Sequence, residues 1–298
     1  MTMQIIHARI ALPHQAEVGE GSLWDERENR LYWVDIHSNA LHRFDPASGN
    51  NQTRDLGEHV GTVVLDQAGG ILVATQNGFA RFDWETGRLS RLGDPEAGNA
   101  ATRFNDGKCD PAGRFWAGTM AYDCAAGAGS LYCMEADGAI SRKLSHITIS
   151  NGLVWSRDTG FFYFIDSLTY QIHRYDYDSG TGRIENQQVV TEFDRESEGL
   201  PDGMAIDVED GLWVAMFGGS AVLRIDPATG ERTHKVELPT ANITSCAFGG
   251  GDMRDLYITS ATVHLDEAQQ QAQPDAGSLF LARSPIAGQT AHRFAGLA

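Results

Sequence analysis

Short apolar runs, each followed by a polar turn, recur along the whole chain. The runs are rich in aromatic and branched aliphatic residues over four or five positions, which is typical of a buried β-strand. The six runs are Leu31–Asp35, Ile71–Thr75, Phe115–Thr119, Phe161–Ile165, Leu212–Met216 and Leu256–Ser260. They start roughly 40 to 51 residues apart, a spacing that is typical of propeller blades. The sequence therefore predicts six copies of one β-sheet unit.

Each run has neighbours on both sides that complete a small antiparallel sheet. A shorter apolar strand precedes it, as in Met204–Asp207, and a third strand follows, as in Leu41–Asp45 before the turn Pro46–Gly49. One such twisted sheet cannot bury both of its faces, whereas six in a ring bury each face against a neighbour and leave few free edges. We therefore predict an all-β protein, a six-bladed β-propeller of four-stranded antiparallel blades that forms a single domain over residues 1–298.

The two ends of the chain complete this prediction. The last repeat, which ends with Gly277–Leu281, is one strand short, and the N-terminal run Gln4–Leu12 lies outside the first repeat. We therefore expect the N-terminal segment to enter the sixth blade and close the ring. The one convincing helix, Leu265–Ala272, falls in a loop of the same blade.

Composition limits the possible partners. The formal net charge of the 298-residue chain is −17, which disfavours nucleic acid and anionic membranes because both require clustered Lys and Arg. No apolar run approaches the ~20 residues of a membrane span, and Met1–Pro13 lacks the pattern of a signal peptide. The four cysteines show no paired spacing, as expected of reduced thiols. These features predict a cytoplasmic protein.

Four polar residues occupy the same place in different repeats, ten or eleven residues ahead of the central run. They are Glu20, Asn105, Asn151 and Asp202, and the same place holds Gly61 in the second repeat and Ser245 in the sixth. In a propeller this place lies at the entrance of the central channel, so the four side chains are predicted to meet at the axis. Two carboxylates and two amides suit Ca²⁺, Mg²⁺ or Mn²⁺ better than Zn²⁺, because no His or Cys joins them. The alternative interpretation is that each is a turn residue, since Asp and Asn beside Gly are common in turns.

Other residues near this register could contact a substrate. Arg103 stands two positions before Asn105, so in an extended strand both side chains point the same way, and its guanidinium could hold an anionic or hydroxylated ligand. Asp123 follows the central strand of the third repeat in a loop that could overhang the channel mouth. None of the ten histidines has HxxxH or HExxH spacing, and no serine lies in a GxSxG motif, which argues against a serine hydrolase.

Segments spread over nearly the whole chain resemble, in the same order, those of the regucalcin/gluconolactonase family, also called the senescence-marker-protein or sugar-lactone lactonase family. The segments that carry the resemblance are Gly19–Trp24, Leu31–Asp35, Arg103–Lys108, Asp110–Arg114, Ala117–Met120, Ile149–Leu153, Phe164–Ser167, Pro201–Met204, Leu212–Ala215 and Thr244–Gly249. The resemblance implies a six-bladed propeller with a ligand site at one end of its channel.

The resemblance also implies a cofactor and a reaction. One divalent cation, Ca²⁺, Zn²⁺, Mn²⁺ or Mg²⁺, would be held by Glu20, Asn151 and Asp202. The implied substrate contacts are Arg103, Asn105 and Asp123. Animal members of the family carry the longer Glu at the last of these positions. The implied reaction is hydrolysis of an aldonolactone to the aldonic acid, with the carbonyl polarised by the cation and the water metal-bound or activated by Asp202 as general base. As partners we expect a small sugar lactone, no nucleic acid and no membrane, in a monomer or weak homodimer.

Two other functions fit the same fold. A non-enzymatic propeller could bind Ca²⁺ or a protein partner, since propellers carry many functions, and an interaction platform predicts exposed apolar patches. A metal-dependent hydrolase of a phosphotriester or an aromatic lactone could use the same site. That alternative predicts an apolar pocket, whereas a sugar lactonase predicts several hydroxyl-binding side chains around the metal.

Overall fold

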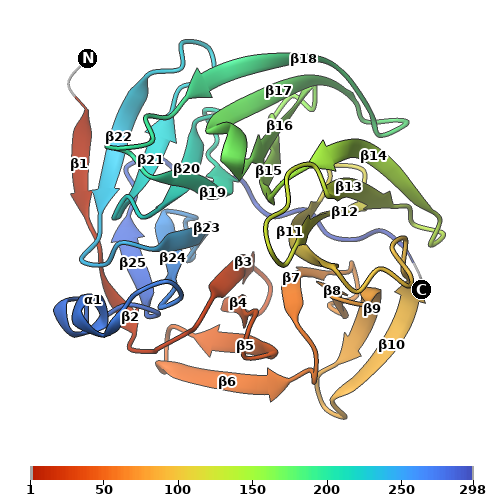
Figure 1. Cartoon of the computed structure of the whole chain (residues 1–298), viewed down its shortest axis with the longest axis horizontal. Helices are drawn as coiled ribbons and strands as arrows, with labels where there is room; N and C mark the ends of the chain where they lie inside the picture. Colours follow the sequence, from red (N-terminus) through yellow and green to blue (C-terminus); the bar gives the residue numbers. More distant parts are fainter. Residues whose placement is uncertain (1–2, 297–298) are drawn as a thin grey trace.

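The structure, a computed structural model, describes residues 3–296 and consists almost entirely of β-strands. Six sheets stand around a central axis, and Figure 1 looks along that axis. Five of the sheets have four strands and one has five. The prediction of a six-bladed β-propeller is confirmed. Within residues 3–296, no helix is both long and apolar enough to cross a lipid bilayer.

Each blade runs outward from an inner strand that faces the axis, and consecutive strands are antiparallel. Blade 1 consists of β3 (Gly19–Asp25), β4 (Arg30–Asp35), β5 (Ala40–Asp45) and β6 (Asn50–Asp55). Blade 2 consists of β7 (Val60–Leu65), β8 (Ile71–Thr75), β9 (Gly78–Asp83) and β10 (Arg88–Gly93). Blade 3 consists of β11 (Thr102–Cys109), β12 (Phe115–Ala121), β13 (Gly129–Met134) and β14 (Ile140–Ile147).

The second half of the ring repeats this plan with additions. Blade 4 consists of β15 (Ser150–Trp155), β16 (Phe161–Asp166), the 3₁₀ helix η1 (Ser167–Thr169), β17 (Gln171–Asp178) and β18 (Arg183–Glu192). Blade 5 consists of β19 (Leu200–Ile206), β20 (Leu212–Phe217), β21 (Ala221–Ile225), β22 (Arg232–Glu237) and β1 (Gln4–His7). Blade 6 consists of β23 (Ile243–Gly249), β24 (Asp255–Ser260), β25 (Leu279–Arg283) and β2 (Arg9–Leu12), with helix α1 (Glu267–Ala272) between β24 and β25.

The N-terminal segment closes the ring, but it is divided between two blades. β2 pairs antiparallel with β25 and supplies the outer strand of blade 6, as predicted. β1 instead pairs in parallel with β22 and adds a fifth strand to blade 5. The segment therefore ties the last two blades together and covers the edge of β22, which would otherwise present unpaired backbone groups.

The predicted helix is present and slightly shorter than expected. It begins at Glu267 because Asp266 caps it: the Asp266 carboxylate accepts a hydrogen bond from Gln269 N at 2.8 Å, and Gln269 Oε1 accepts one from Asp266 N at 2.9 Å. This reciprocal capping box satisfies backbone N–H groups at the first turn.

The apolar runs of the sequence form the packing between blades. The second strand of alternate blades contributes a tryptophan that is at most 1% exposed, namely Trp33, Trp116 and Trp213. Neighbouring blades share one core cluster each, such as the cluster that joins Val154 of blade 4 to Val214 of blade 5. Burial of each such side chain contributes about 1.5–3 kcal/mol, so the repeated runs account for both the fold and its rigidity.

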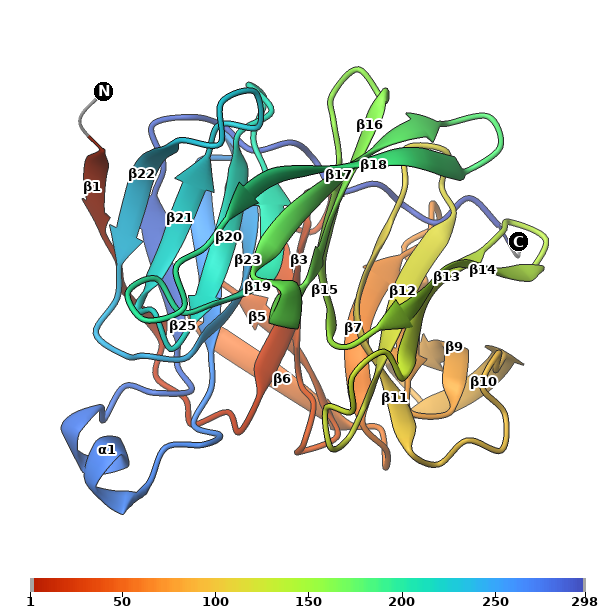
Figure 2. The same cartoon turned by 45° about the horizontal axis from the view of Figure 1, so that its top comes forward.

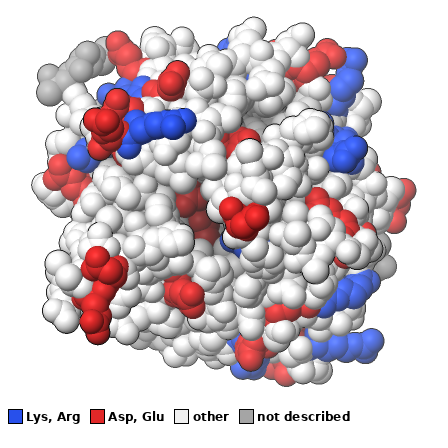
Figure 3. All heavy atoms as spheres, in the orientation of Figure 1, with Lys and Arg blue, Asp and Glu red and all other residues white. Residues whose placement is uncertain are grey.

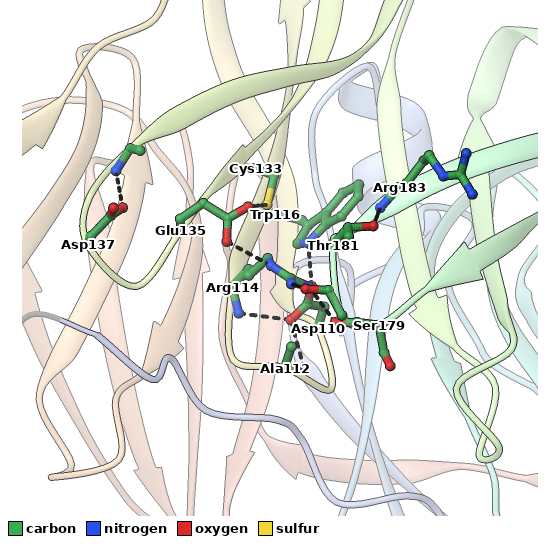
Figure 4. Close-up of polar contacts among 12 residues, drawn as sticks. Asp110, Ala112, Arg114, Trp116, Cys133, Glu135, Asp137, Ser179, Thr181 and Arg183 are labelled. Atoms are coloured by element: carbon green, nitrogen blue, oxygen red, sulfur yellow. Dashed lines mark hydrogen bonds and ion pairs between the residues drawn. The ribbon is translucent and has the colours of Figure 1, made fainter.

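An aspartate at the end of the inner strand fixes the turn into the second strand in several blades. In blade 3, Asp110 accepts hydrogen bonds from Arg114 N at 2.8 Å and Trp116 Nε1 at 2.9 Å and pairs with the Arg114 guanidinium at 3.0 Å (Figure 4). Arg114 also pairs with Glu135 at 2.8 Å. Related pairs are Asp207–Arg224 in blade 5, Asp66–Arg81 in blade 2 and Asp25–Arg293 in blade 1. These buried, fully bonded carboxylates serve the fold.

The chain after β25 crosses one end of the channel as a C-terminal strap, residues 285–296. Its backbone pairs with three blades: Gln289 N donates to Ile206 O at 3.0 Å, Phe294 N to Leu65 O at 2.9 Å and Ala295 N to Gly113 O at 2.9 Å. Figure 2 shows this strap on the opposite face from helix α1. The strap therefore crosses the channel at one end, and the other end is on the face that carries α1.

Candidate active site at the mouth of the channel

Every inner strand departs from regular pairing at the same level of the ring. The shifts in register fall between Glu20 and Leu23, Val60 and Thr62, Phe104 and Gly107, Ser150 and Leu153, Pro201 and Met204, and Ile243 and Ser245. A β-bulge breaks the alternation of side chains and re-aims them. The predicted ligand positions lie in or beside these bulges. Equivalent positions of the sequence repeats therefore lie at the same level around the axis.

The structure brings the predicted axial residues together. Glu20 of β3, Asn105 of β11, Asn151 of β15 and Asp202 of β19 line one cavity of about 520 Å³, and Arg103 lies beside them. None of these five side chains is more than 7% exposed. Figure 3 shows the hollow at the centre of this face, with acidic side chains inside it. Their identification as ligands and substrate contacts stays a prediction.

A chain of hydrogen bonds fixes the two amides. Arg103 Nη1 donates to Asn105 Oδ1 at 2.7 Å, and Asn105 Nδ2 donates to Asn151 Oδ1 at 2.9 Å. Asn151 Nδ2 donates to Ser167 Oγ at 2.7 Å, and that hydroxyl donates to Pro201 O at 2.6 Å. The chain links blades 3, 4 and 5 and leaves Asn151 Oδ1 with a free lone pair. Ser167, which the sequence analysis did not assign to the site, therefore orients a predicted ligand.

Two carboxyl groups, those of Glu20 and Asp202, line the cavity and hydrogen-bond to each other. Burial raises the pKa of Asp202 well above its usual value, and the charges of Glu20 and Asp106 raise it further. Burial also raises the pKa of Glu20, again with a contribution from Asp106. Glu20 Oε2 accepts one hydrogen bond, from Gly21 N at 3.0 Å, whereas Asp202 Oδ1 is buried and has no partner among the described residues. Burying two negative charges side by side costs free energy unless one carboxylate takes up a proton or a cation binds between them.

The donor set fits a hard divalent cation. Across residues 3–296, no three His, Cys, Asp or Glu side chains are grouped so as to hold a metal. The available donors are instead two carboxylates and two amide oxygens, which suit oxygen-seeking cations such as Ca²⁺. An oxygen set of this size leaves positions for water and substrate.

The two remaining blades supply no ligand, each for a different reason. At Gly61 an added Cβ would lie 2.4 Å from Asn105 O, so β7 packs directly against the backbone of β11. In blade 6, Ser245 Oγ hydrogen-bonds to Ser22 Oγ at 3.0 Å, and Ser245 is not among the residues that line the cavity. The predicted ligand positions that line the cavity therefore lie on blades 1, 3, 4 and 5.

Asp123 lies at the rim rather than on the floor. It is exposed, it lines the same cavity, and its Oδ1 accepts a hydrogen bond from Ala125 N at 3.0 Å. Its neighbour Tyr122 is held by a 3.0 Å hydrogen bond to His59 Nδ1. The structure thus places the predicted loop at the channel mouth, where Asp123 could reach a ligand from above.

Asp106 is the charged residue of this region that the sequence analysis missed. It is 3% exposed, its Oδ1 accepts a hydrogen bond from Gly107 N at 2.7 Å, and its Oδ2 has no partner among the described residues. The corresponding bulge position holds Gly152 in blade 4 and Gly203 in blade 5. The sequence did contain a signal for Asp106, because this repeat has a carboxylate at a position where the repeats of blades 4 and 5 have glycine.

Residues 18–262 match the family model described as the SMP-30/Gluconolactonase/LRE-like region. The chain belongs to this family. It is 40% identical over 282 residues to “Putative sugar lactone lactonase YvrE” of Bacillus subtilis, covering 95% of this chain and 96% of that protein. It is 41% identical over 280 residues to regucalcin of Danio rerio, covering 93% and 94%. The resemblance inferred from the motifs is confirmed.

A solved structure shows the same family fold. A protein described as calcium-binding, a regucalcin of Agrobacterium tumefaciens, superposes with a TM-score of 0.93 and 28% sequence identity over 99% of both chains. The two proteins therefore share the whole propeller, including the strands that carry the cavity.

Proposed function

We propose that this family member is a metal-dependent sugar lactonase that hydrolyses an aldonolactone to the aldonic acid. The observation that carries the proposal is the convergence of two buried carboxylates, Glu20 and Asp202, with the amides of Asn105 and Asn151 on the floor of one cavity. The names of the family and of its Bacillus subtilis member support the choice of reaction.

Glu20, Asn151 and Asp202 would hold the cation. Once bound there, a divalent cation supplies Lewis-acid stabilisation for the charge that develops on the lactone carbonyl oxygen. We propose Ca²⁺ first, because the donors are all oxygens and the Agrobacterium tumefaciens relative is described as calcium-binding. Mg²⁺ and Mn²⁺ share this preference for oxygen, and Zn²⁺ is disfavoured by the lack of His and Cys.

The side chains around the cation can perform the proton transfers of ester hydrolysis. The Asp202 carboxylate lines the cavity and can take a proton from water as the water oxygen attacks the carbonyl carbon. The same carboxyl can give that proton to the ring oxygen when the C–O bond breaks. Asn105, fixed by its bonds to Arg103 and Asn151, orients the lactone or the attacking water.

The cavity suits a small polar substrate. Its volume of about 520 Å³ lies in the range of small-molecule sites. Arg103 has donors left over after its bonds to Phe104 O and Asn105 Oδ1, and these can hold ring hydroxyls. Asp123 can accept a hydroxyl donor at the rim.

One observation favours a second candidate substrate class. Met120, Phe217 and Val263 form an apolar part of the cavity wall. Such a wall fits the less polar ring of an aromatic lactone, which the same carboxylates could hydrolyse.

Acid release from a panel of aldonolactones and one aromatic lactone tests the proposal. We expect hydrolysis that a chelator abolishes and that Ca²⁺ or Mn²⁺ restores. Asp202→Asn should lower kcat by about 10³-fold or more, because it removes the negative charge of a ligand and the base, with an unchanged circular dichroism spectrum. Glu231→Gln, which changes an exposed acid of the same blade, is the matched control. Near-normal turnover by Asp202→Asn with metal present would refute the assignment, and turnover of the aromatic lactone alone would select the second candidate.

A further inference from the structure

Beneath the predicted ligands, the channel contains a second layer of charge formed by Asp106 and Lys108 of β11. Lys108 Nζ donates to Met204 O of β19 at 2.8 Å. Because β11 and β19 belong to blades 3 and 5, which are not neighbours, the Lys108 side chain crosses the channel. It lines a smaller cavity of about 80 Å³ on the side of the C-terminal strap, and it is absent from the lining of the larger cavity. Lys108 therefore lies on the strap side of the predicted ligands.

Asp106 lies in the same region and lines neither cavity. Its Oδ2 is buried without a hydrogen-bond partner among the described residues, and no ion pair to it is found there. A buried carboxylate in this state is costly unless nearby charge compensates for it. Both residues are close enough to Glu20 to affect it: the charge of Asp106 raises the pKa of the Glu20 carboxyl, and the charge of Lys108 lowers it.

The fold itself does not require an aspartate at this position. In blades 4 and 5 the equivalent bulge position holds Gly152 and Gly203, and those bulges form with the same two-against-one register. Asp106 also differs from Asp110 in the same strand, whose oxygens are bonded to the turn and to Arg114. Asp110 thus stabilises the turn, whereas one oxygen of Asp106 is buried and has no hydrogen-bond partner among the described residues.

We propose that Asp106 and Lys108 set the cation affinity of the site from below, in opposite directions, without being ligands. Asp106 strengthens binding through its negative charge, and Lys108 weakens it through its positive charge. Both effects reach the site because charges interact over several ångströms in a buried, low-dielectric channel and are little screened there by salt. This inference rests on the proposed cation site at Glu20, Asn151 and Asp202.

Calorimetric titration of the metal-free protein with Ca²⁺, at fixed pH and ionic strength, tests the inference. Asp106→Asn keeps the shape and removes the charge, and we expect its Kd to rise at least about tenfold. Lys108→Met should lower Kd at least about threefold, and the double variant should fall between the two. Asp137→Asn, which changes an exposed acid in a hairpin of the same blade, is the matched control and should match the wild type. Circular dichroism in chelator confirms that each variant is folded.

The opposite changes in Kd expected for Asp106→Asn and Lys108→Met distinguish an electrostatic role of these residues from a structural one. If Asp106→Asn binds Ca²⁺ within twofold of the wild type, or if Lys108→Met weakens binding as Asp106→Asn does, the inference is overturned. If Asp106→Asn fails to fold, the sign of the change in Lys108→Met alone decides: tighter binding supports the inference and any other result overturns it. A wild-type protein that binds no Ca²⁺, Mg²⁺ or Mn²⁺ would instead overturn the proposed function as well.

Discussion

At the scale of the residue, the site depends on acidic groups that are kept together and away from water. Glu20 and Asp202 are both at most 7% exposed, and burial is the largest cause of the raised pKa of each. The metal-free protein therefore favours protons at these groups, whereas a bound cation favours the ionised carboxylates. Cation binding should accordingly weaken as the pH falls.

This competition predicts a pH dependence of stability. The pKa of Glu20 is raised from 4.5 to about 8, so between these values the folded metal-free protein holds a proton that the unfolded chain has lost. Its free energy of unfolding should therefore fall as the pH rises through this window. Glu20→Gln removes the effect, so in chelator its stability relative to the wild type should grow by about 1–3 kcal/mol between pH 5 and pH 8. Urea unfolding at both pH values measures the difference, and a constant difference would contradict the account.

The sequence predicted some of these residues and not others, for physical reasons. Glu20, Asn151 and Asp202 were predicted to meet because a nearly equal offset from the central strand, ten or eleven residues, places them at a similar height on the axis. Asp106 was missed because a bulge turns two consecutive residues away from the regular alternation, which a period of two does not predict. Ser167 was missed because its role depends on a hydrogen bond to Asn151, a contact that the repeat pattern does not encode.

At the scale of the element, the inner strands position the site and the outer strands close the ring. The aromatic runs predicted the central strands well, because those strands are buried on both faces. The division of Gln4–Leu12 into β1 and β2 was not predicted, because both pieces are short and partly exposed and neither has a pattern that selects its partner. The pairing of β1 with blade 5 and of β2 with blade 6 is therefore decided by the free strand edges of the assembled ring.

Two truncations separate the roles of these strands. A chain that begins at Ala8 loses only β1, an added parallel edge strand whose Ile5 is 43% exposed, and should lose no more than about 1 kcal/mol of stability. A chain that begins at Pro13 also loses β2 and uncovers β25, so it should lose several times more. Thermal unfolding of both, with the full chain as reference, checks the order. Equal losses would mean that β2 does not close the ring.

At the scale of the whole molecule, a closed ring brings four distant parts of the chain to one point. The C-terminal strap covers the far end of the channel, and the net charge of −17 together with the acidic hollow of Figure 3 attracts cations to the open end. The side chains gathered at the channel mouth are thus expected to bind a single divalent cation.

Anomalous diffraction from crystals soaked in Mn²⁺ tests that claim most directly. The account predicts one strong peak on the cavity floor, about 2.0–2.6 Å from oxygens of Glu20, Asn151 and Asp202, and its loss in crystals of Asp202→Asn. An empty cavity at saturating Mn²⁺ and Ca²⁺, or a peak held by other residues, would contradict it.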